Sequence, residues 1–356
     1  MNAAPKTLRH LSDLGEAGLV DAEKRQALER VATQYAVAIT PAMTELIDQF
    51  DTHDPIARQF VPSAAELDVR PEENADPIGD RAHSPVEGIV HRYPDRALLK
   101  LTPVCAVYCR FCFRREMVGP GVKPLSPKQL DAALGYVADH PKIWEVILTG
   151  GDPLVLSARR LRQVVSRLAA IEHVKVIRVH TRVPVADPAR VTPELVRALK
   201  APGKATYVVL HANHARELTA AAREACARFV DAGIPMLSQS VLLAGVNDDP
   251  QTLGTLMRAL VECRIKPYYL HHGDLAPGTS HLRTSIERGQ ELMRALHGRL
   301  SGLCQPAYVL DIPGGHGKSP IGPNYLTQDG PGCHRIEDFN GGLHCYPPRN
   351  DSPPRT

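Results

Sequence analysis

The chain has 356 residues, of which 43% are hydrophobic, and a formal net charge of +3. This length allows one large core and a smaller appendage. So small a charge, without a run of lysine or arginine, argues against a nucleic-acid partner. No stretch approaches the roughly 18 apolar residues of a membrane span, and residues 1–15 lack the apolar core of a secretory signal. We therefore expect a cytoplasmic protein without a membrane partner.

Two regions precede the predicted core of the chain. Apolar residues recur with helical periodicity over residues 22–36 and 41–50, which predicts a helical region over residues 1–60. Residues 61–92 are rich in Pro, Asp and Glu, a composition typical of an extended connector on the surface.

A regular alternation of strand-like and helical segments occupies residues 93–326. The strand-like runs are residues 97–102, 145–149, 175–180, 206–211, 235–243, 266–271 and 307–312. The helical stretches between them are residues 127–140, 158–171, 193–199, 215–232, 250–263 and 286–300. A strand followed by a helix, six times over and closed by a last strand, predicts parallel strands with crossover helices. The predicted fold class is α/β, an incomplete parallel (β/α)6 barrel with an N-terminal helical extension. A doubly wound open sheet has the same local pattern and is the competing fold.

Three of the eight cysteines, Cys105, Cys109 and Cys112, follow the first predicted strand within eight residues. Such clustering argues for a metal centre and a reducing compartment rather than a disulfide framework. Three thiolates can bind three irons of a 4Fe–4S cluster and leave the fourth iron open for a substrate. A structural zinc site needs a fourth protein ligand, and none lies nearby in the sequence. Buried free cysteines or a disulfide pair would also accommodate this spacing. The C-x3-C-x2-C spacing resembles the cluster motif of radical S-adenosylmethionine (SAM) enzymes.

Polar residues recur at the carboxyl ends of the predicted strands, where parallel barrels build their active sites. Besides the cysteines they are Gly150, Gly151, Asp152, Arg182, His211, Asp274 and Asp311, with Gln239 inside the fifth strand. One such residue often only caps the next helix, but so many in register predict a shared site. Gly150 and Gly151 lack a Cβ and would let the backbone approach a ligand. Gly-Gly-Asp, one strand after the cysteines, resembles the segment with which radical SAM enzymes bind the cofactor's methionyl amino group.

A glycine-rich segment near residue 315 contains Lys318. Ile312 stands where a Walker-type phosphate loop needs glycine, and Pro320 prevents the helix that would follow, so that type of phosphate site is not expected. A lysine in a flexible loop at an active rim can instead form a Schiff base with an aldehyde cofactor. A solvent-exposed loop lysine without a catalytic role would have the same local sequence.

Taken together, these motifs resemble those of the lysine 2,3-aminomutase family. The shared segments are residues 91–96, the cysteine motif ending in Arg114-Arg115, and residues 149–154, 213–214, 239–243, 313–318 and 324–325. The resemblance implies a 4Fe–4S cluster, SAM and pyridoxal 5′-phosphate (PLP) on an incomplete barrel. It implies that Lys318 holds PLP, with Arg92 and Arg96 near the phosphate. The residues implied to bind SAM are Gly150, Gly151, Asp152, His211 and Gln239.

The implied substrate is free L-lysine, whose amino group would move from C2 to C3 by a 5′-deoxyadenosyl radical mechanism to give β-lysine. Its ε-ammonium needs anionic partners, because a desolvated unpaired charge is costly. Asp274 and Asp311 match the family's two side-chain-binding aspartates in position. Arg114 matches its carboxylate-binding arginine, which can bind bidentately. The resemblance also implies an electron donor such as flavodoxin or ferredoxin and is compatible with a homo-oligomer.

The chain departs from the family pattern in two places. Asp249 stands where zinc-binding members place a cysteine, and the family's C-terminal cysteine cluster is missing. We therefore expect no zinc site of that type and a different or smaller oligomer.

Residues 327–356 are predicted to form a C-terminal tail that is disordered beyond Tyr346. The five cysteines outside the motif are interpreted as structural: Cys226, Cys263, Cys304, Cys333 and Cys345. A metal site formed by the last two with His334 and His344 is the less favoured interpretation.

Three other functions stay open at the level of the sequence. One is a radical SAM aminomutase that acts on another amino acid or serves the modification of elongation factor P. The second is a radical SAM enzyme without PLP, in which Lys318 is incidental. The third is a non-catalytic protein whose cysteines hold zinc.

Overall fold

The computed structural model describes residues 6–21, 23 and 25–348. Its main sheet has nine strands, in the order β1 to β9, so that each strand pairs with its neighbour in the sequence. They are β1 (Ile89–Tyr93), β2 (Arg96–Thr102), β3 (Glu145–Gly150), β4 (Val176–Thr181), β5 (Ala205–His211), β6 (Met236–Val241), β7 (Ile265–His271), β8 (Ala307–Ile312) and β9 (Gly317–Pro320). Strands β2 to β8 are parallel, whereas β1 and β9 are antiparallel to their neighbours at the two edges.

The strand order confirms the predicted incomplete barrel and excludes the doubly wound sheet. In a doubly wound sheet the strand order reverses at a switch point, whereas here it follows the chain from one edge to the other. Strands β2 to β8 correspond to the seven predicted strands. The edge strands β1 and β9 have no counterpart in the prediction, which assigns their residues to the connector and to a flexible loop.

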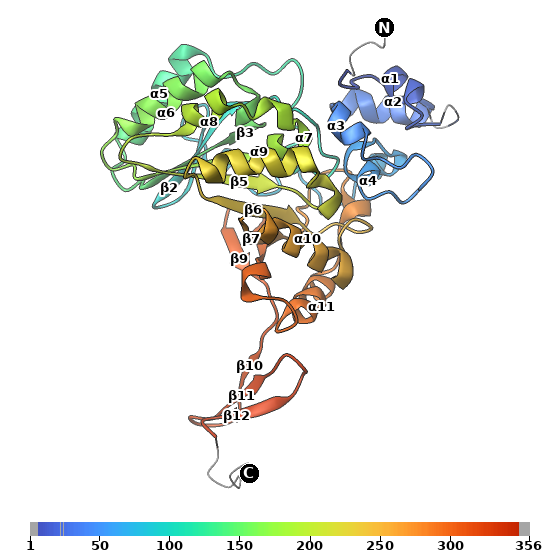
Figure 1. Cartoon of the computed structure of the whole chain (residues 1–356), viewed down its shortest axis with the longest axis vertical. Helices are drawn as coiled ribbons and strands as arrows, with labels where there is room; N and C mark the ends of the chain where they lie inside the picture. Colours follow the sequence, from blue (N-terminus) through green and yellow to red (C-terminus); the bar gives the residue numbers. More distant parts are fainter. Residues whose placement is uncertain (1–5, 22, 24, 349–356) are drawn as a thin grey trace.

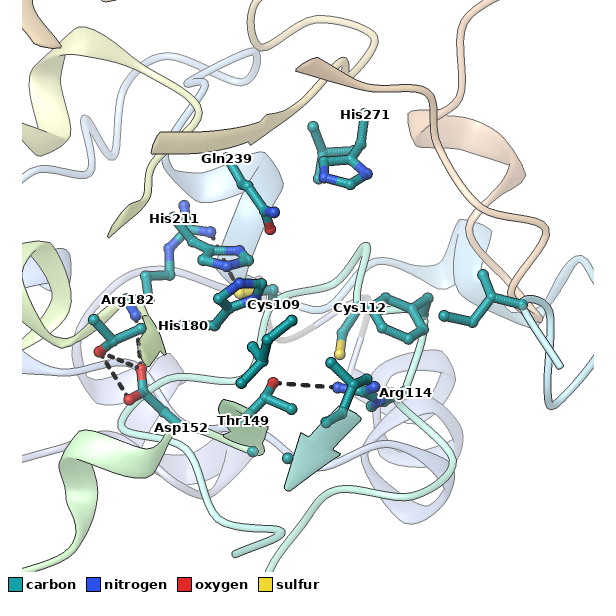
Figure 2. Close-up of a pocket in the computed structure, with 18 of the residues that line it drawn as sticks. Cys109, Cys112, Arg114, Thr149, Asp152, His180, Arg182, His211, Gln239 and His271 are labelled. Carbon is teal, nitrogen blue, oxygen red and sulfur yellow. Dashed lines mark hydrogen bonds between the residues drawn. The ribbon is translucent and has the colours of Figure 1, made fainter. Parts of the chain in front are cut away.

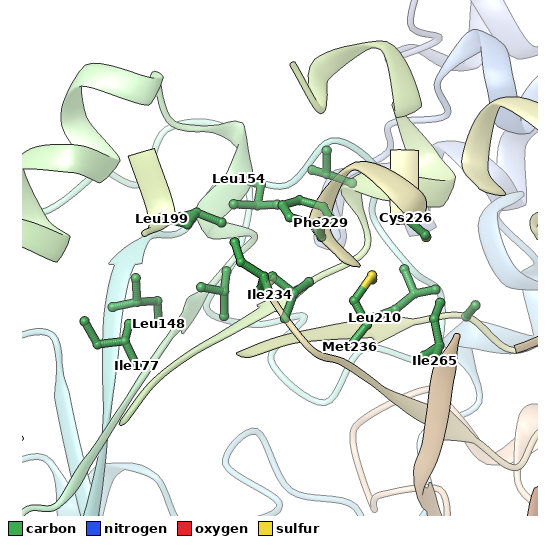
Figure 3. Close-up of a cluster of buried hydrophobic side chains, with 14 of the residues drawn as sticks. Leu148, Leu154, Ile177, Leu199, Leu210, Cys226, Phe229, Ile234, Met236 and Ile265 are labelled. Carbon is green, nitrogen blue, oxygen red and sulfur yellow. The ribbon is translucent and has the colours of Figure 1, made fainter. Parts of the chain in front are cut away.

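Six helices pack on the sheet: α5 (Pro127–Ala138), α6 (Ala158–Ala169), α8 (Pro193–Leu199), α9 (Ala220–Asp231), α10 (Pro250–Glu262) and α11 (Ile286–Leu296). Each begins after a Ser, Thr or Asp whose side-chain oxygen accepts a backbone N–H of the first turn. Figure 3 shows the core that results, in which Leu148, Ile177 and Leu210 of the strands and Leu199 and Phe229 of the helices belong to one apolar cluster. This packing leaves the carboxyl ends of the strands to carry the polar residues.

The N-terminal region packs beside the barrel (Figure 1). Its helices are α1 (Leu11–Glu16), α2 (Arg25–Gln34), α3 (Pro41–Thr44) and α4 (Ala57–Phe60). Their apolar cluster includes Leu14, Ile39 and Phe60 and extends to Val107 in the loop after β2. The N-terminal region therefore supports the cysteine loop directly.

The connector over residues 61–92 lies only partly on the surface. Glu66 and Asp80 are 0% and 1% exposed. Glu66 accepts hydrogen bonds from Arg110 at 3.0 Å and from Arg115, and Asp80 accepts one from Arg114 at 2.8 Å. The acidic composition suggested solvent exposure, but buried acids of this kind persist because arginines of the cysteine loop neutralise them.

The predicted C-terminal tail contains a second sheet, made of β10 (Leu326–Gln328), β11 (His334–Glu337) and β12 (Leu343–Tyr346). It extends away from the barrel (Figure 1). The disorder predicted beyond Tyr346 concerns mainly residues 349–356, which lie outside the described residues. Among the helices of the described part, none is both long and apolar enough to cross a membrane.

Candidate active site

A cavity of about 270 Å³ lies at the carboxyl ends of the parallel strands and brings together every residue predicted for the site. Its lining includes Cys105, Cys109, Cys112, Arg92, Arg96, Arg114, Gly150, Gly151, Asp152, His211, Gln239, Asp274, Asp311 and Lys318. Figure 2 shows part of this wall. The polar residues at the strand ends therefore lie around one cavity, as predicted.

The three motif cysteines line the cavity from one loop. In a 4Fe–4S cluster each thiolate binds a different iron. Cys105, Cys109 and Cys112 can therefore hold three irons of such a cluster and leave the fourth without a protein ligand.

Burial raises the pKa of all three thiols, to about 11 at Cys109. The Arg182 guanidinium opposes this shift, because its Nη1 lies 3.6 Å from the Cys109 sulfur. Arg182 is itself held by Glu217 at 2.6 Å and Gln59 at 2.7 Å. Metal binding drives thiols to ionise, and Arg182 supplies a fixed positive charge beside the resulting thiolate.

Chain packing gives Gly150 and Gly151 a second role besides the predicted approach of the backbone to a ligand. A Cβ on Gly151 would lie 2.4 Å from the Val104 carbonyl oxygen, and one on Gly150 would lie 2.5 Å from that of Thr102. The space left by the missing side chains is thus filled by the start of the cysteine loop. The two segments of the site are locked together at this point.

Asp152 completes the same segment from a buried position. Its carboxylate accepts hydrogen bonds from the Thr181 hydroxyl at 2.8 Å, the Arg182 backbone N–H at 2.7 Å and the Leu154 N–H at 3.0 Å. Burial raises the pKa of Asp152 despite these donors. The carboxylate therefore ties the end of β3 to the end of β4 and fixes the shape of the Gly-Gly-Asp turn.

Three histidines line the cavity from β4, β5 and β7: His180, His211 and His271. Burial lowers the pKa of each, to about 3 at His211, so all three are neutral near pH 7. Their Nε2 atoms are buried and have no hydrogen-bond partner among the described residues. Because buried polar atoms are normally satisfied, these nitrogens mark places where a ligand supplies the partner. Gln239 of β6 lies close to His211 (Figure 2).

Lys318 lies in strand β9, paired with Asp311 of β8, and not in a flexible loop. The turn between them uses Gly314 and Gly315 at φ of +84° and +87°, where other residues are strained. The Lys318 side-chain Nζ donates to Asp311 Oδ1 at 2.8 Å, and its backbone N–H donates to the Tyr93 hydroxyl at 2.7 Å. Since Tyr93 belongs to β1, the two edge strands meet at this lysine.

The two acids predicted to face the substrate have opposite pKa shifts. Burial, reinforced by the charge of Asp311, raises the pKa of Asp274 to about 8. Burial also tends to raise the pKa of Asp311. A hydrogen bond from His271 and the positive charge of Lys318 outweigh burial, so the pKa of Asp311 is lowered. Near pH 7, Asp274 is therefore protonated and Asp311 is ionised.

Arg114 is held by a residue that the sequence did not reveal. Its Nε and Nη2 donate to Asp80 Oδ2 at 2.9 and 2.8 Å, and its Nη1 lies 3.4 Å from the Thr149 hydroxyl. Asp80 also accepts from Arg92 at 3.1 Å through its other oxygen. One buried carboxylate thus orients Arg114 and Arg92, two of the three arginines that were predicted to lie beside anionic groups.

Asp80, Tyr93, His180 and His271 are the site residues that sequence reasoning missed. His180 and His271 end predicted strands, so the strand-end rule would have found them. Tyr93 adjoins the predicted arginines but carries no separate signal. Asp80 lies among other acidic residues of the connector, so the sequence does not single it out. The only indication of such a residue is that buried arginines need a negatively charged partner.

Comparisons with known proteins agree with the motifs. The profile of the Radical SAM superfamily matches residues 99–256, and a profile described as lysine-2,3-aminomutase matches residues 293–355. The L-lysine 2,3-aminomutase of Acetoanaerobium sticklandii is 41% identical over 324 residues, which cover 91% of this chain and 78% of the relative. The chain belongs to the lysine 2,3-aminomutase family. Another member, the L-lysine 2,3-aminomutase of Clostridium subterminale, is 38% identical over 91% of this chain and 78% of its own. The glutamate 2,3-aminomutase of Clostridioides difficile is 36% identical over a region that covers 90% of this chain and 75% of the relative.

Membership in the lysine 2,3-aminomutase family makes this chain a radical SAM isomerase whose cofactors are a 4Fe–4S cluster, SAM and PLP. The cavity fits all three. It offers three thiols on one loop, a lysine fixed at the wall, and buried histidine and arginine nitrogens that have no partner in the described part of the chain.

Proposed function

We propose that this enzyme moves the amino group of free L-lysine from C2 to C3 and so produces β-lysine. The observation that carries the proposal is the charge pattern of the cavity, where Asp274 and Asp311 accompany Lys318 and a guanidinium, Arg114, lines the same space. Lysine has an ammonium for the acids and a carboxylate for the arginine. Glutamate, named as substrate of the Clostridioides relative, would bring its second carboxylate against two acids.

The cofactor residues are assigned by what surrounds them. Cys105, Cys109 and Cys112 would hold the cluster, and Lys318 would hold PLP through Nζ. The PLP phosphate would lie near Arg92, whose buried Nε has no partner among the residues described, and near Arg96. The residues proposed to contact SAM are Gly150, Gly151, Asp152, His211 and Gln239. When bound, the cluster and SAM would supply a 5′-deoxyadenosyl radical that takes hydrogen from the substrate, and PLP would supply a conjugated π-system that stabilises the migration of the nitrogen from C2 to C3 of the substrate.

Arg114 is proposed to bind the substrate carboxylate through one edge of its guanidinium. Asp80 occupies the Nε–Nη2 edge. The Nη1–Nη2 edge, whose contact with Thr149 is long at 3.4 Å, is the one that suits a second carboxylate. Asp80 thereby fixes the orientation of Arg114 before substrate arrives, which lowers the entropic cost of binding.

Asp274 and Asp311 are proposed to bind the ε-ammonium in different ways. Asp311 is ionised already, and in the absence of cofactor its charge is matched by Lys318 at 2.8 Å. With Lys318 Nζ bound to PLP, Asp311 would keep its contact with His271 and would pair with the substrate ε-ammonium in place of Lys318. Asp274, with its raised pKa, is proposed to release a proton as the ammonium binds, because an adjacent positive charge favours the ionised carboxylate.

Three further assignments belong to the same proposal. The cluster has to be reduced by one electron, for which we propose a small donor such as flavodoxin or ferredoxin. We propose the cytoplasm as the compartment, because the eight cysteines are free thiols and thiols persist in a reducing environment. We also propose a homo-oligomer, in line with the exposed apolar side chains of the C-terminal sheet.

The test compares substrates on anaerobically reconstituted enzyme. Lysine should yield β-lysine by amino-acid analysis, glutamate should not react, and norleucine, which lacks only the ε-ammonium, should lose most of the rate. Borohydride reduction followed by peptide mapping should place reduced PLP on Lys318. Equal turnover of norleucine and lysine would contradict the substrate assignment, whereas a label elsewhere would contradict the PLP assignment.

A further inference from the structure

The C-terminal sheet has little apolar core of its own. It comprises the short strands β10, β11 and β12, and its large apolar side chains Leu326, Leu343 and Tyr346 are 50%, 62% and 61% exposed. Its contacts with the barrel include an ion pair between Glu337 of β11 and Arg294 of α11. Small units of this kind commonly depend on a covalent or metal cross-link.

The register of this sheet places two cysteines and an aspartate on one face. Gln328 pairs with His334, and one step further the Asp329 backbone N–H donates to the Cys333 carbonyl at 2.9 Å, so Asp329 and Cys333 lie opposite each other. On the other side of β11, Arg335 pairs with Cys345. Because side chains alternate along a strand, Cys333, Arg335 and Cys345 share a face with Asp329.

The three potential ligands converge on one point. The Sγ atoms of Cys333 and Cys345 and a carboxylate oxygen of Asp329 all lie within 4.8 Å of one another. Among the described residues, no other three His, Cys, Asp or Glu side chains meet so closely. The guanidinium Nε of Arg335 donates to Asp329 Oδ2 at 2.9 Å and so orients the carboxylate, as second ligand layers do at metal sites.

The register also favours a metal over a disulfide. Cys333 and Cys345 are diagonal neighbours on adjacent strands. Diagonal Cα atoms are typically about 7–8 Å apart, whereas disulfides usually join Cα atoms about 4.4–6.8 Å apart. An ion above the sheet can bind both sulfur atoms without moving the strands together.

We propose that Asp329, Cys333 and Cys345 bind a zinc ion that holds the C-terminal sheet together. Two thiolates select a soft or borderline cation, and the carboxylate favours Zn²⁺ over Cu⁺. Water completes the tetrahedron. Binding forms two Zn–S bonds and releases the two thiol protons to solvent.

The predicted site that includes His334 and His344 does not form. His344 Nε2 contacts Asp338 at 2.6 Å. His334 pairs with Tyr346 and lies on the face opposite Cys333. The proposed zinc site is separate from the cavity and does not depend on the aminomutase reaction.

The test measures zinc and iron on the full chain after anaerobic cluster reconstitution, addition of Zn²⁺ and desalting. About one Zn²⁺ per chain should remain. Cys345→Ser should weaken zinc binding by at least about 100-fold, since even the loss of an outer-layer partner costs about 10–100-fold. Iron content should not change. Asp329→Asn, which preserves both thiols and the side-chain shape, should weaken binding less than Cys345→Ser.

His334→Ala and His344→Ala are the matched controls on the same sheet and should retain zinc. Co²⁺ added in place of Zn²⁺ should give a sulfur-to-metal charge-transfer band that Cys333→Ser removes. Substoichiometric zinc in the parent chain would overturn the proposal. So would loss of zinc in either histidine variant, or a Cys333–Cys345 disulfide in peptide maps of protein kept under anaerobic conditions.

Discussion

The raised pKa of Asp274 predicts an unusual pH dependence for the variant Asp274→Asn. Asparagine preserves the shape of the side chain and resembles the protonated acid, so the variant lacks only the ability to ionise. In the free enzyme Asp274 has a pKa of about 8, and it is charged above that value. Binding of an ammonium requires the charged form, so the advantage of the parent enzyme over the variant should grow as pH rises through about 8.

The magnitude follows from two terms. Loss of one charge from a desolvated pair costs about 2–5 kcal/mol. At pH 7, one unit below the pKa of about 8, ionising Asp274 first costs about 1.4 kcal/mol. The variant should therefore lose only about 0.6–3.6 kcal/mol there, which is about 3- to 400-fold in kcat/KM. At pH 9 the full loss applies, about 30-fold or more.

The assay is kcat/KM for lysine between pH 7 and 9, expressed as the ratio of parent to variant. Titration of lysine itself cancels in this ratio, because both enzymes receive the same substrate. The ratio should rise about tenfold across the range. Asp131→Asn, at an exposed aspartate on α5 paired with Arg167, is the control and should give a ratio near unity at every pH. A large but pH-independent ratio for Asp274→Asn would show that the acid is ionised throughout and would refute the assigned pKa.

Three other substitutions test separate parts of the site. Cys109→Ala should abolish cluster iron and turnover while borohydride still fixes PLP to Lys318; full activity with two cysteines would contradict the three-ligand assignment. Arg114→Lys should lower kcat/KM for lysine by about tenfold or more, because an ammonium cannot bind a carboxylate and Asp80 through two parallel edges; unchanged kinetics would remove Arg114 from the substrate site. Gly151→Ala should lower the free energy of unfolding by about 1–3 kcal/mol, since its Cβ would meet the Val104 carbonyl at 2.4 Å. In Gly135→Ala, where nothing lies within 4 Å of the new Cβ, α5 should keep or gain stability.

Local sequence patterns predicted strands β3 to β6 well because these strands are buried over most of their length and each is followed by a helix. Runs such as residues 206–211 contain the continuous apolar, β-branched residues that this environment selects. Strand β9 could not be predicted in the same way. It has four residues beside a glycine turn, and only its pairing with β8 makes it a strand. A glycine-rich sequence has no local preference that distinguishes an ordered hairpin from a flexible loop.

The residues that carry the chemistry were predictable from their side chains, whereas the residues that hold them in position were not. Cysteines, the lysine and strand-end acids carry their chemistry in the side chain, so their spacing alone is informative. Asp80 is 34 positions away from Arg114 in the chain, and an aspartate in an acidic segment looks like any solvated charge. Likewise Gly151 reads as a ligand-facing glycine, and only the fold shows that it accommodates the backbone of Val104.

Buried ion pairs explain why the cysteine loop can hold its shape before a cluster is bound. Arg110 lies between Cys109 and Cys112, and Arg114 and Arg115 follow Cys112 closely. Each of the three pairs with a buried acid of the connector, Glu66 or Asp80. Removing one member of such a pair strands a buried charge, which is strongly destabilising. The loop is therefore anchored by ion pairs independent of iron, while Lys318 is held by Asp311 of β8 and Tyr93 of β1. Because the cysteine loop and Lys318 have different anchoring partners, loss of a cysteine should leave PLP attachment intact.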